Sequence, residues 1–322
     1  MGVDPARSLP VRVEPADDEG GLGFIFRLLS ANGLSFRDAQ HWLGLKSWNP
    51  LKAQEIKVLA WIAGVDQSWL VDRTVTCLGW DAPRTYGLMG HRFGTGMADY
   101  LHSAKLCPLC VKRKKYHRVT WQLRCICCCI EHAALLSERC PHCGNLIRWN
   151  RPAVDICSCG SFITAASAMA NLPPHVSGWV EWLECRLLNS ESYKSAASYG
   201  LPTFLGSLSI DGAFRVVVAV GLLPDVNCPL SQASAWATTS IGMAEIVSRG
   251  IERLLCLGNR LSDISSIEPL IHLPILERMR TNGASSSDIN CASVLLNYLR
   301  AGSKTHFEQR GRYLRGQLPL FN

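Results

Sequence analysis

The sequence predicts a mainly α-helical protein with a small middle segment that metal ions stabilise. The first observation is that apolar residues recur at helical spacing on both sides of that middle, between breaks rich in Gly and Ser. The second is that residues 106–160 contain four short pairs of Cys and His in series. We therefore expect three domains: a helical domain over residues 1–100, a tandem metal-binding domain over 101–165 and a second helical domain over 166–322.

Composition sets the class of protein and the expected compartment. With 322 residues, 48% hydrophobic and 18% charged, the chain is typical of an ordered globular protein, and its net charge of +7 mildly favours a polyanionic partner. The 15 Cys are an odd number, and the polar start lacks a signal-peptide core, which argues against a secreted disulfide framework. The longest apolar run, Val216–Leu223, is far shorter than the roughly 20 residues of a membrane helix. We expect a cytoplasmic protein that binds no membrane and whose reduced thiols bind metal.

The N-terminal part has the outline of a helix-turn-helix. Leu22–Leu29 is apolar enough for a short buried helix, which Asn32-Gly33 then interrupts. Ser35 can cap a second helix, Phe36–Leu43. The polar residues of this second helix could contact DNA; they are Arg37, Asp38, Gln40 and His41. The alternative is an ordinary helical hairpin whose polar face is only solvated.

Two further segments complete the N-terminal domain. Lys52–Ala63 predicts a third helix, because Ile56 and Leu59 share an apolar face while Lys52 and Lys57 lie on the other. Asp81–Gly96 contains one Pro and four Gly, so we expect an irregular connector into the metal-binding region.

The middle segment has the ligand spacing of zinc sites. Zinc takes four Cys or His ligands in structural sites, and two ligands on one tight turn can reach one ion together. The four pairs are Cys107 and Cys110, Cys129 and His132, Cys140 and Cys143, and Cys157 and Cys159. They predict two structural Zn²⁺ sites with four protein ligands each. Because no position is left open for water, we expect a scaffold and no enzyme.

Several Cys and His residues of the chain are not assigned as ligands. Cys128 would also reach if the segment before His132 were helical, but the spacing from Cys129 to His132 favours Cys129. Cys125, Cys127 and Cys128 are then small buried residues, and His142 points away from the second site. The isolated thiols are expected in the core; they are Cys77, Cys185, Cys228, Cys256 and Cys291.

A basic run lies between the first two pairs. It consists of Lys112, Arg113, Lys114, Lys115 and Arg118, with Tyr116 and Trp121 interleaved. Such a run could neutralise phosphates of a nucleic acid; the alternative is a solvated loop. For His117 within it we expect a packing or surface role.

The C-terminal part is again apolar and helical. Trp179–Leu188 and Met243–Leu257 predict helices with one buried face, whereas Phe214–Leu223 fits either a buried strand or a buried helix. Leu270–Met279, the break at Asn282-Gly283 and a helix up to Leu299 suggest a second helix-turn-helix. Asp288 and Asn290 lie at the start of its second helix, but the exposed face is less basic than in the first helix-turn-helix, which argues against base reading here. The tail 304–315 is a basic arm or a frayed end.

Zinc deaminases are the sharpest enzymatic alternative for the middle segment. They need His-x-Glu and then Pro before the first Cys of a Cys-x-x-Cys pair. Here Glu131 directly precedes His132, and Pro141 follows Cys140, so the order fails. No phosphate-binding loop or nucleophile elbow is present in the sequence either.

Several stretches resemble the TniQ/TnsD family of bacterial transposon target-selection proteins. They are LPVRVEPADDEGGLGFIFRLLSANGLS, YLHSAKLCPLC with the following YHRVTWQL, IEHAALLSERCPHCGNLIRW and the closing CSCG. The resemblance covers about the first half of the chain and is specific, because ligand order, Trp121 and the leader agree together. Departures are Gly20 and Gly21, where relatives often carry Ser or a bulkier residue, and the run of Cys before His132.

The resemblance implies a function and partners. By it, the eight Cys and His residues above are the family's zinc ligands, and Leu22–Leu43 is its helix-turn-helix. It implies an adaptor without strand chemistry that links target DNA, or an RNA-guided CRISPR effector complex of the Cascade kind, to an AAA+ transposition regulator like TnsC or TniC and so to the transposase. Self-association into a homodimer is a further expectation in the guided systems. The runner-up is a stand-alone zinc-containing, sequence-specific DNA-binding transcriptional regulator.

Overall fold

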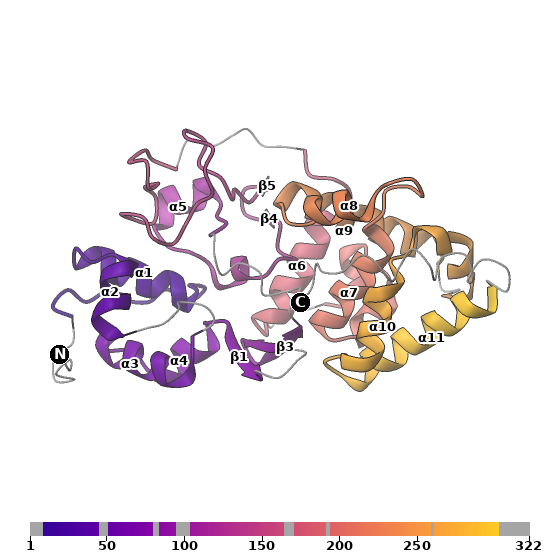
Figure 1. The fold of residues 1–322 in the computed structure, drawn as a ribbon, viewed down its shortest axis with the longest axis horizontal. Coiled ribbons are helices and arrows are strands. Elements are labelled where there is room, and N and C mark those ends of the chain that lie inside the picture. The colour runs from indigo at the N-terminus through magenta and orange to yellow at the C-terminus, as the bar shows by residue number, and fades with distance from the viewer. Residues whose placement is uncertain are drawn as a thin grey trace. The chain divides into compact units, whose positions relative to one another are not determined.

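The structure is a computed structural model that describes residues 9–44, 51–79, 84–94, 104–163, 171–190, 194–258 and 261–302. The chain divides into two compact units, Met1–Asn171 and Leu172–Asn322. Helices dominate both units (Figure 1), so the predicted mainly α class is confirmed. The N-terminal helices and the cysteine-rich region share the first unit, and the basic tail 304–315 lies outside the described residues.

Four short helices begin the first unit, and they confirm the three helices predicted there. They are α1 (Gly21–Ala31), α2 (Phe36–Leu43), α3 (Ala53–Ala63) and α4 (Gln67–Asp72). Ser35 caps α2 as predicted: its Oγ accepts from the backbone N–H of Asp38 at 3.1 Å, while its own N–H donates to Asp38 Oδ2 at 2.9 Å. These hydrogen bonds from Ser35 lower the pKa of Asp38. Asp38 therefore completes the capping box at the start of α2.

Residues 81–96 contain two strands of a small sheet where we expected an irregular connector. Strands β1 (Thr76–Gly79), β2 (Thr85–Leu88) and β3 (His91–Gly94) form an antiparallel sheet in the order β1-β2-β3. Met89 and Gly90 have φ of 52° and 75°, the left-handed conformation that a two-residue hairpin turn requires at both positions. The prediction was wrong because it took the glycines for breaks, while Gly90 makes the turn that joins two paired strands.

The cysteine-rich part of the first unit contains little regular structure. Its elements are α5 (Pro108–Lys114), a 3₁₀ turn over Val119–Gln122, β4 (Cys128–Cys129) and β5 (Ala134–Leu135). The leader before α1 lies against it, since the N–H of Gly20 donates to His117 O and that of Val119 to Asp18 O, both at 2.8 Å. A Cβ on Gly20 would come within 2.8 Å of Gln122 Nε2, and one on Gly21 within 2.1 Å of Thr74 Oγ1. A side chain at either of the two departures from the family pattern would therefore displace a neighbour, Gln122 at Gly20 and Thr74 at Gly21.

The regular structure of the second unit consists of helices, with no strand among its described residues. Its α-helices are α6 (Val176–Leu187), α7 (Ile210–Gly221), α8 (Leu230–Trp236), α9 (Ser240–Cys256), α10 (Leu273–Asn282) and α11 (Ser286–Gly302). The predicted helices at 179–188 and 243–257 are confirmed, and the apolar run 214–223 is the buried helix α7 instead of a strand. Among the described residues, no helix has both the length and the apolar character needed to cross a membrane.

Helices α7 and α9 cross at very close approach. A Cβ on Gly221 would lie 2.1 Å from Ile246 O, and one on Gly250 would lie 2.3 Å from Val217 O. Arg249 Nε donates to Gly221 O at 2.8 Å, and Arg253 donates to Val220 O and Leu223 O at 2.7 and 2.8 Å. These two arginines, which the helical pattern places on the outer face of α9, are half-buried because they cap the carbonyl end of α7.

Candidate metal centres and their surroundings

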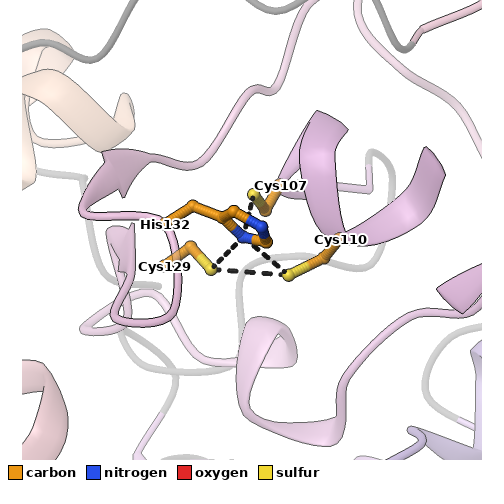
Figure 2. A group of neighbouring side chains, drawn as sticks. All are labelled: Cys107, Cys110, Cys129 and His132. Atoms are coloured by element: carbon orange, nitrogen blue, oxygen red, sulfur yellow. Dashed lines mark hydrogen bonds between the residues drawn. The ribbon is translucent and has the colours of Figure 1, made fainter. Parts of the chain in front are cut away.

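The first candidate centre joins a helix start to a small hairpin (Figure 2). Cys107 is the N-cap of α5 and Cys110 lies in its first turn, while Cys129 ends β4 and His132 lies in the turn before β5. Pro108 at the start of α5 suits this position, because the first helical residue needs no backbone N–H donor. The pairing of Cys129 with Ala134 closes the hairpin and directs both of its ligand atoms at the helix.

The distances in the first cluster fit one tetrahedral ion. Cys110 Sγ and Cys129 Sγ lie 3.5 Å apart, and His132 Nδ1 lies 3.6, 3.2 and 3.5 Å from the sulfurs of Cys107, Cys110 and Cys129. Zinc bonds of about 2.3 Å to sulfur and 2.0–2.1 Å to nitrogen give tetrahedral edges of about 3.8 Å between sulfurs and about 3.6 Å between sulfur and nitrogen. Disulfides, with S–S of about 2.05 Å, are far shorter.

The structure also shows which of the cysteines before His132 belongs to the first cluster. It brings Cys129 into the cluster and leaves Cys125, Cys127 and Cys128 outside it, each 0% exposed. Cys128 points away because successive residues of a strand face opposite sides. The three neighbouring cysteines are thus small buried residues, as predicted.

The second candidate centre gathers Cys140, Cys143, Cys157 and Cys159. Cys140 Sγ lies 3.9 Å from Cys159 Sγ, and Cys143 Sγ lies 3.8 Å from Cys157 Sγ, which again fits the sulfur–sulfur edge of a zinc tetrahedron. Each pair sits on a tight turn, since Gly144 N–H donates to Cys140 O and Gly160 N–H to Cys157 O, both at 2.9 Å. His142 is exposed and outside the cluster, as predicted.

The protonation of the first cluster shows why a cation suits it. The thiols of Cys110 and Cys129 hydrogen-bond to Cys107, which lowers the pKa of Cys107 to about 3. The same contacts raise the pKa of Cys110. Neighbouring thiols therefore cannot all ionise by themselves, whereas a divalent cation would stabilise them as thiolates. Three Cys with one His, and four Cys, are the donor sets of structural zinc, so both clusters could hold zinc.

The isolated thiols are not core residues, contrary to our expectation. Among them Cys256 is exposed, and the others are half-buried; these are Cys77, Cys185, Cys228 and Cys291. They lie near the ends of elements or at partly solvated helix positions, so apolar neighbours in the sequence did not imply burial. Cys256, for example, is the last residue of α9.

The basic run is largely neutralised within the protein. Arg113 and Lys114 both pair with Glu131, the latter at 3.0 Å. Lys115 pairs with Asp155, and Arg118 Nε lies 2.7 Å from Asp18 Oδ2. Lys112 is exposed and makes no ion pair with a described residue. The carboxylates come from positions up to a hundred residues away, so nothing in the run itself could reveal them.

The polar residues of the two helical hairpins differ in accessibility. On α2, Arg37 and His41 are exposed and Gln40 is half-buried. At the start of α11, Asn290 is exposed but Asp288 is 0% exposed. Asp288 accepts hydrogen bonds from Ser209 N at 2.9 Å, Ser209 Oγ at 2.6 Å and Ser285 N at 3.0 Å. Asp288 is therefore not available to read bases, because its carboxylate holds the starts of α7 and α11 together inside the unit.

Two buried cations near the metal clusters were not anticipated from the sequence. Lys105 is 2% exposed; its Nζ donates to Leu123 O at 2.7 Å and also to Ile126 O, and burial lowers its pKa to about 8. It thereby holds the loop that leads into β4 and Cys129. No signal beyond its place next to the first Cys pair marks Lys105.

The second buried cation is Arg151, between the two halves of the second cluster. It is 3% exposed, and burial lowers its pKa to about 9. One of its amino groups lies 2.6 Å from His117 Nε2, and its guanidinium lies 4.7 Å from the ring centre of Phe26. Burial and Arg151 keep the pKa of His117 well below its usual value, so His117 packs as a neutral ring, in line with the packing role expected for it.

Comparison with known proteins identifies the first part of the chain. The family model TniQ matches residues 10–136, which include the leader, helices α1–α4, the three-stranded sheet and the first metal cluster. A comparison with curated proteins found no match. The match confirms the resemblance read from the leader and the first ligand pairs, and it connects the chain with target selection in transposition in general. Residues 10–136 of the chain are therefore similar to a TniQ domain.

Proposed function

We propose that this protein is an adaptor for target-site selection in DNA transposition. It would link a chosen target to an AAA+ transposition regulator of the TnsC or TniC kind, which brings in the transposase. The observation that carries the proposal is the TniQ match over residues 10–136. The target would be reached by direct DNA contact or through an RNA-guided effector complex of the Cascade kind.

In this proposal the metal clusters are scaffold. Each offers four protein donors to one ion, so no position remains open for water or substrate. Bound zinc would supply folding free energy to a segment with little regular structure. Consistent with this role, the leader, α1 and the cysteine-rich part interlock through backbone hydrogen bonds of Gly20 and Val119. A partner that binds the helices would thus meet a surface that the metal region supports.

Fewer residues are available for DNA contact than the sequence suggested. Arg37 and His41 are exposed and lie one helical turn apart on α2. Lys112 is the residue of the basic run that makes no ion pair with a described residue. Gln40 is half-buried and has interactions within the chain. We propose Arg37, His41 and Lys112 as the first residues to test, before the paired cations of the run.

The test is a direct comparison of two partners for the full chain. An AAA+ transposition regulator of the TnsC or TniC kind is mixed with the purified protein in the presence of ATP, and complex formation is followed by size-exclusion chromatography with light scattering. In parallel, binding to duplex DNA is measured over a range of salt concentrations. A stable complex with the ATPase is the result that we expect, and the same light-scattering run reports whether the chain is a homodimer.

The opposite result would favour the runner-up. Strong duplex binding with a steep salt dependence, and no contact with the ATPase, would make the protein a stand-alone zinc-containing DNA-binding regulator. The double variant Arg37→Ala, His41→Ala should then lose duplex affinity. Lys57→Ala, which removes an exposed charge from the neighbouring helix α3, is the matched control.

A further inference from the structure

The cysteines of the two clusters are exposed to solvent to different extents. In the first cluster Cys107, Cys110 and Cys129 are at most 1% exposed. In the second, Cys143 is half-buried and Cys159 is exposed. Oxidants and chelators attack thiolates that they can reach from solvent, so exposure selects which cluster reacts first. The second cluster is the accessible one.

The segment enclosed by the second cluster holds the buried Arg151. Its guanidinium donates to Arg148 O at 2.6 Å and to Val154 O at 3.2 Å, and it contacts His117 and the ring of Phe26 on α1. Cys143 precedes this segment and Cys157 follows it, so an ion bound to both would fix its two ends. A buried cation of this kind stays in place only while its acceptors remain in position.

Two further contacts tie the same segment to the rest of the unit. Ser30 Oγ on α1 donates to Pro152 O at 2.7 Å. Asp155, 6% exposed, pairs with Lys115 at the end of α5. The enclosed segment therefore touches both α1 and the basic run.

We propose that the second cluster is an oxidation-sensitive latch that holds residues 148–155 against α1 while its metal ion is bound. Oxidation at the exposed Cys159 would release the ion and loosen this segment. The inference needs metal in both clusters, but it does not depend on the proposed role in transposition. The oxidant is a peroxide, a class of molecule that cells encounter under oxidative stress.

The chemistry proceeds in two steps. The Cys159 thiolate attacks one oxygen of hydrogen peroxide, the O–O bond breaks, and a sulfenic acid and hydroxide form. The Cys140 thiolate, whose sulfur lies 3.9 Å away, then attacks the Cys159 sulfur and displaces a second hydroxide, which gives a disulfide. The two thiolates lose two electrons in all, and the two hydroxides take up protons from solvent to give water. The ion leaves because two of its four ligands are then covalently joined.

Metal release from the full chain tests this order. Protein carrying two zinc equivalents is treated with hydrogen peroxide, and released zinc is followed with a chromogenic chelator. One equivalent should leave on the order of tenfold faster than the other, since access governs thiolate reactivity. Mass spectrometry after alkylation should find the bond between Cys140 and Cys159 while Cys107, Cys110 and Cys129 remain reduced. Reductant with added zinc should restore the starting state.

Two variants serve as comparison. Cys256→Ser removes an exposed thiol outside both clusters and should leave the fast phase unchanged. Cys159→Ser should abolish the disulfide. If that variant fails to fold, the kinetics and mass spectra of the unaltered chain still decide. Simultaneous loss of both ions, oxidation of the first cluster before the second, or saturation at one zinc equivalent would each overturn the proposal.

Hydrogen–deuterium exchange tests the latch itself. After oxidation, amide exchange should rise in residues 148–156 and in α1, while α11 in the other unit keeps its rate. Unchanged exchange in α1 after complete formation of the disulfide would show that the segment is not a latch.

Discussion

Asp288 gives the sharpest test of how the second unit is held together. Its carboxylate accepts hydrogen bonds from the backbone N–H of Ser209 before α7 and of Ser285 before α11, and a third from Ser209 Oγ. It is 0% exposed, so no water replaces these bonds when the carboxylate is removed. Asp288→Ala removes the acceptor of Ser209 N–H, Ser209 Oγ and Ser285 N–H and leaves these donors without a partner.

The expected cost follows from the number of bonds lost. An unsatisfied buried donor costs about 1–3 kcal/mol. For two N–H groups and one hydroxyl, we expect Asp288→Ala to lower the free energy of unfolding by about 3–5 kcal/mol. Asp288→Asn keeps the shape and one acceptor oxygen, so about 1–2 kcal/mol is expected.

The assay is urea unfolding of the full chain followed by circular dichroism, together with scanning calorimetry. At about 2–4 °C per kcal/mol for a unit of this size, Asp288→Ala should shift one thermal transition by about 10 °C. Asn290→Ala, an exposed neighbour on α11, is the control and should change stability by less than about 0.5 kcal/mol. A loss below about 1 kcal/mol for Asp288→Ala would refute the reasoning.

Four other predictions concern the metal centres, the basic run and pH. Removing metal with a strong chelator should unfold residues 106–160, seen as loss of amide protection there while α7 and α9 stay protected; full protection in zinc-free protein would contradict the scaffold role. Lys105→Met should speed zinc loss from the first cluster on the order of tenfold, because the loop before Cys129 loses its anchor, and equal retention would refute this. If the chain binds duplex DNA, Lys112→Ala should reduce the salt slope by about 0.9, whereas the ion-paired Arg113→Ala should change it less; equal slopes for both would contradict the pairing argument. Burial lowers the pKa of His272 to about 4. As the pH falls from about 6.5 to 4, the unfolded chain therefore takes up a proton at this residue that the folded chain does not, which should cost up to about 3 kcal/mol of stability by pH 4. His272→Gln should remove this loss.

Local chemical signals predicted the helices and the metal ligands well. The capped hairpin around Ser35 and the ligand spacing from Cys107 to Cys159 depend on residues close in sequence, so their geometry follows from the chain itself. The hairpin turn at Met89 and Gly90 was missed because a glycine marks either a break or a turn between paired strands. Only the pairing partners distinguish these two cases.

Long-range partners account for most of what the sequence could not show. Asp18 and Asp155, both outside the basic run, neutralise Arg118 and Lys115, and a charge run does not indicate where its counter-ions lie. Asp288 and Asn290 are two residues apart at the start of one helix, yet one is buried and the other exposed. The arginines of α9 likewise fit a solvated face by pattern and instead cap a neighbouring helix.

The contact between Phe26 and the segment that contains Arg151 determines which N-terminal fragments of this protein should be soluble when expressed alone. Phe26 is 0% exposed, and part of its cover comes from Trp149, whose ring centre lies 6.3 Å away, and from Arg151. A fragment that stops at residue 136, where the family match ends, would leave this side of α1 uncovered and prone to aggregate. During synthesis, α1 likewise remains uncovered until more than a hundred further residues have left the ribosome. A soluble N-terminal fragment should therefore extend to at least residue 163, because Ile163 is 0% exposed and its N–H donates to Asp155 O at 2.8 Å.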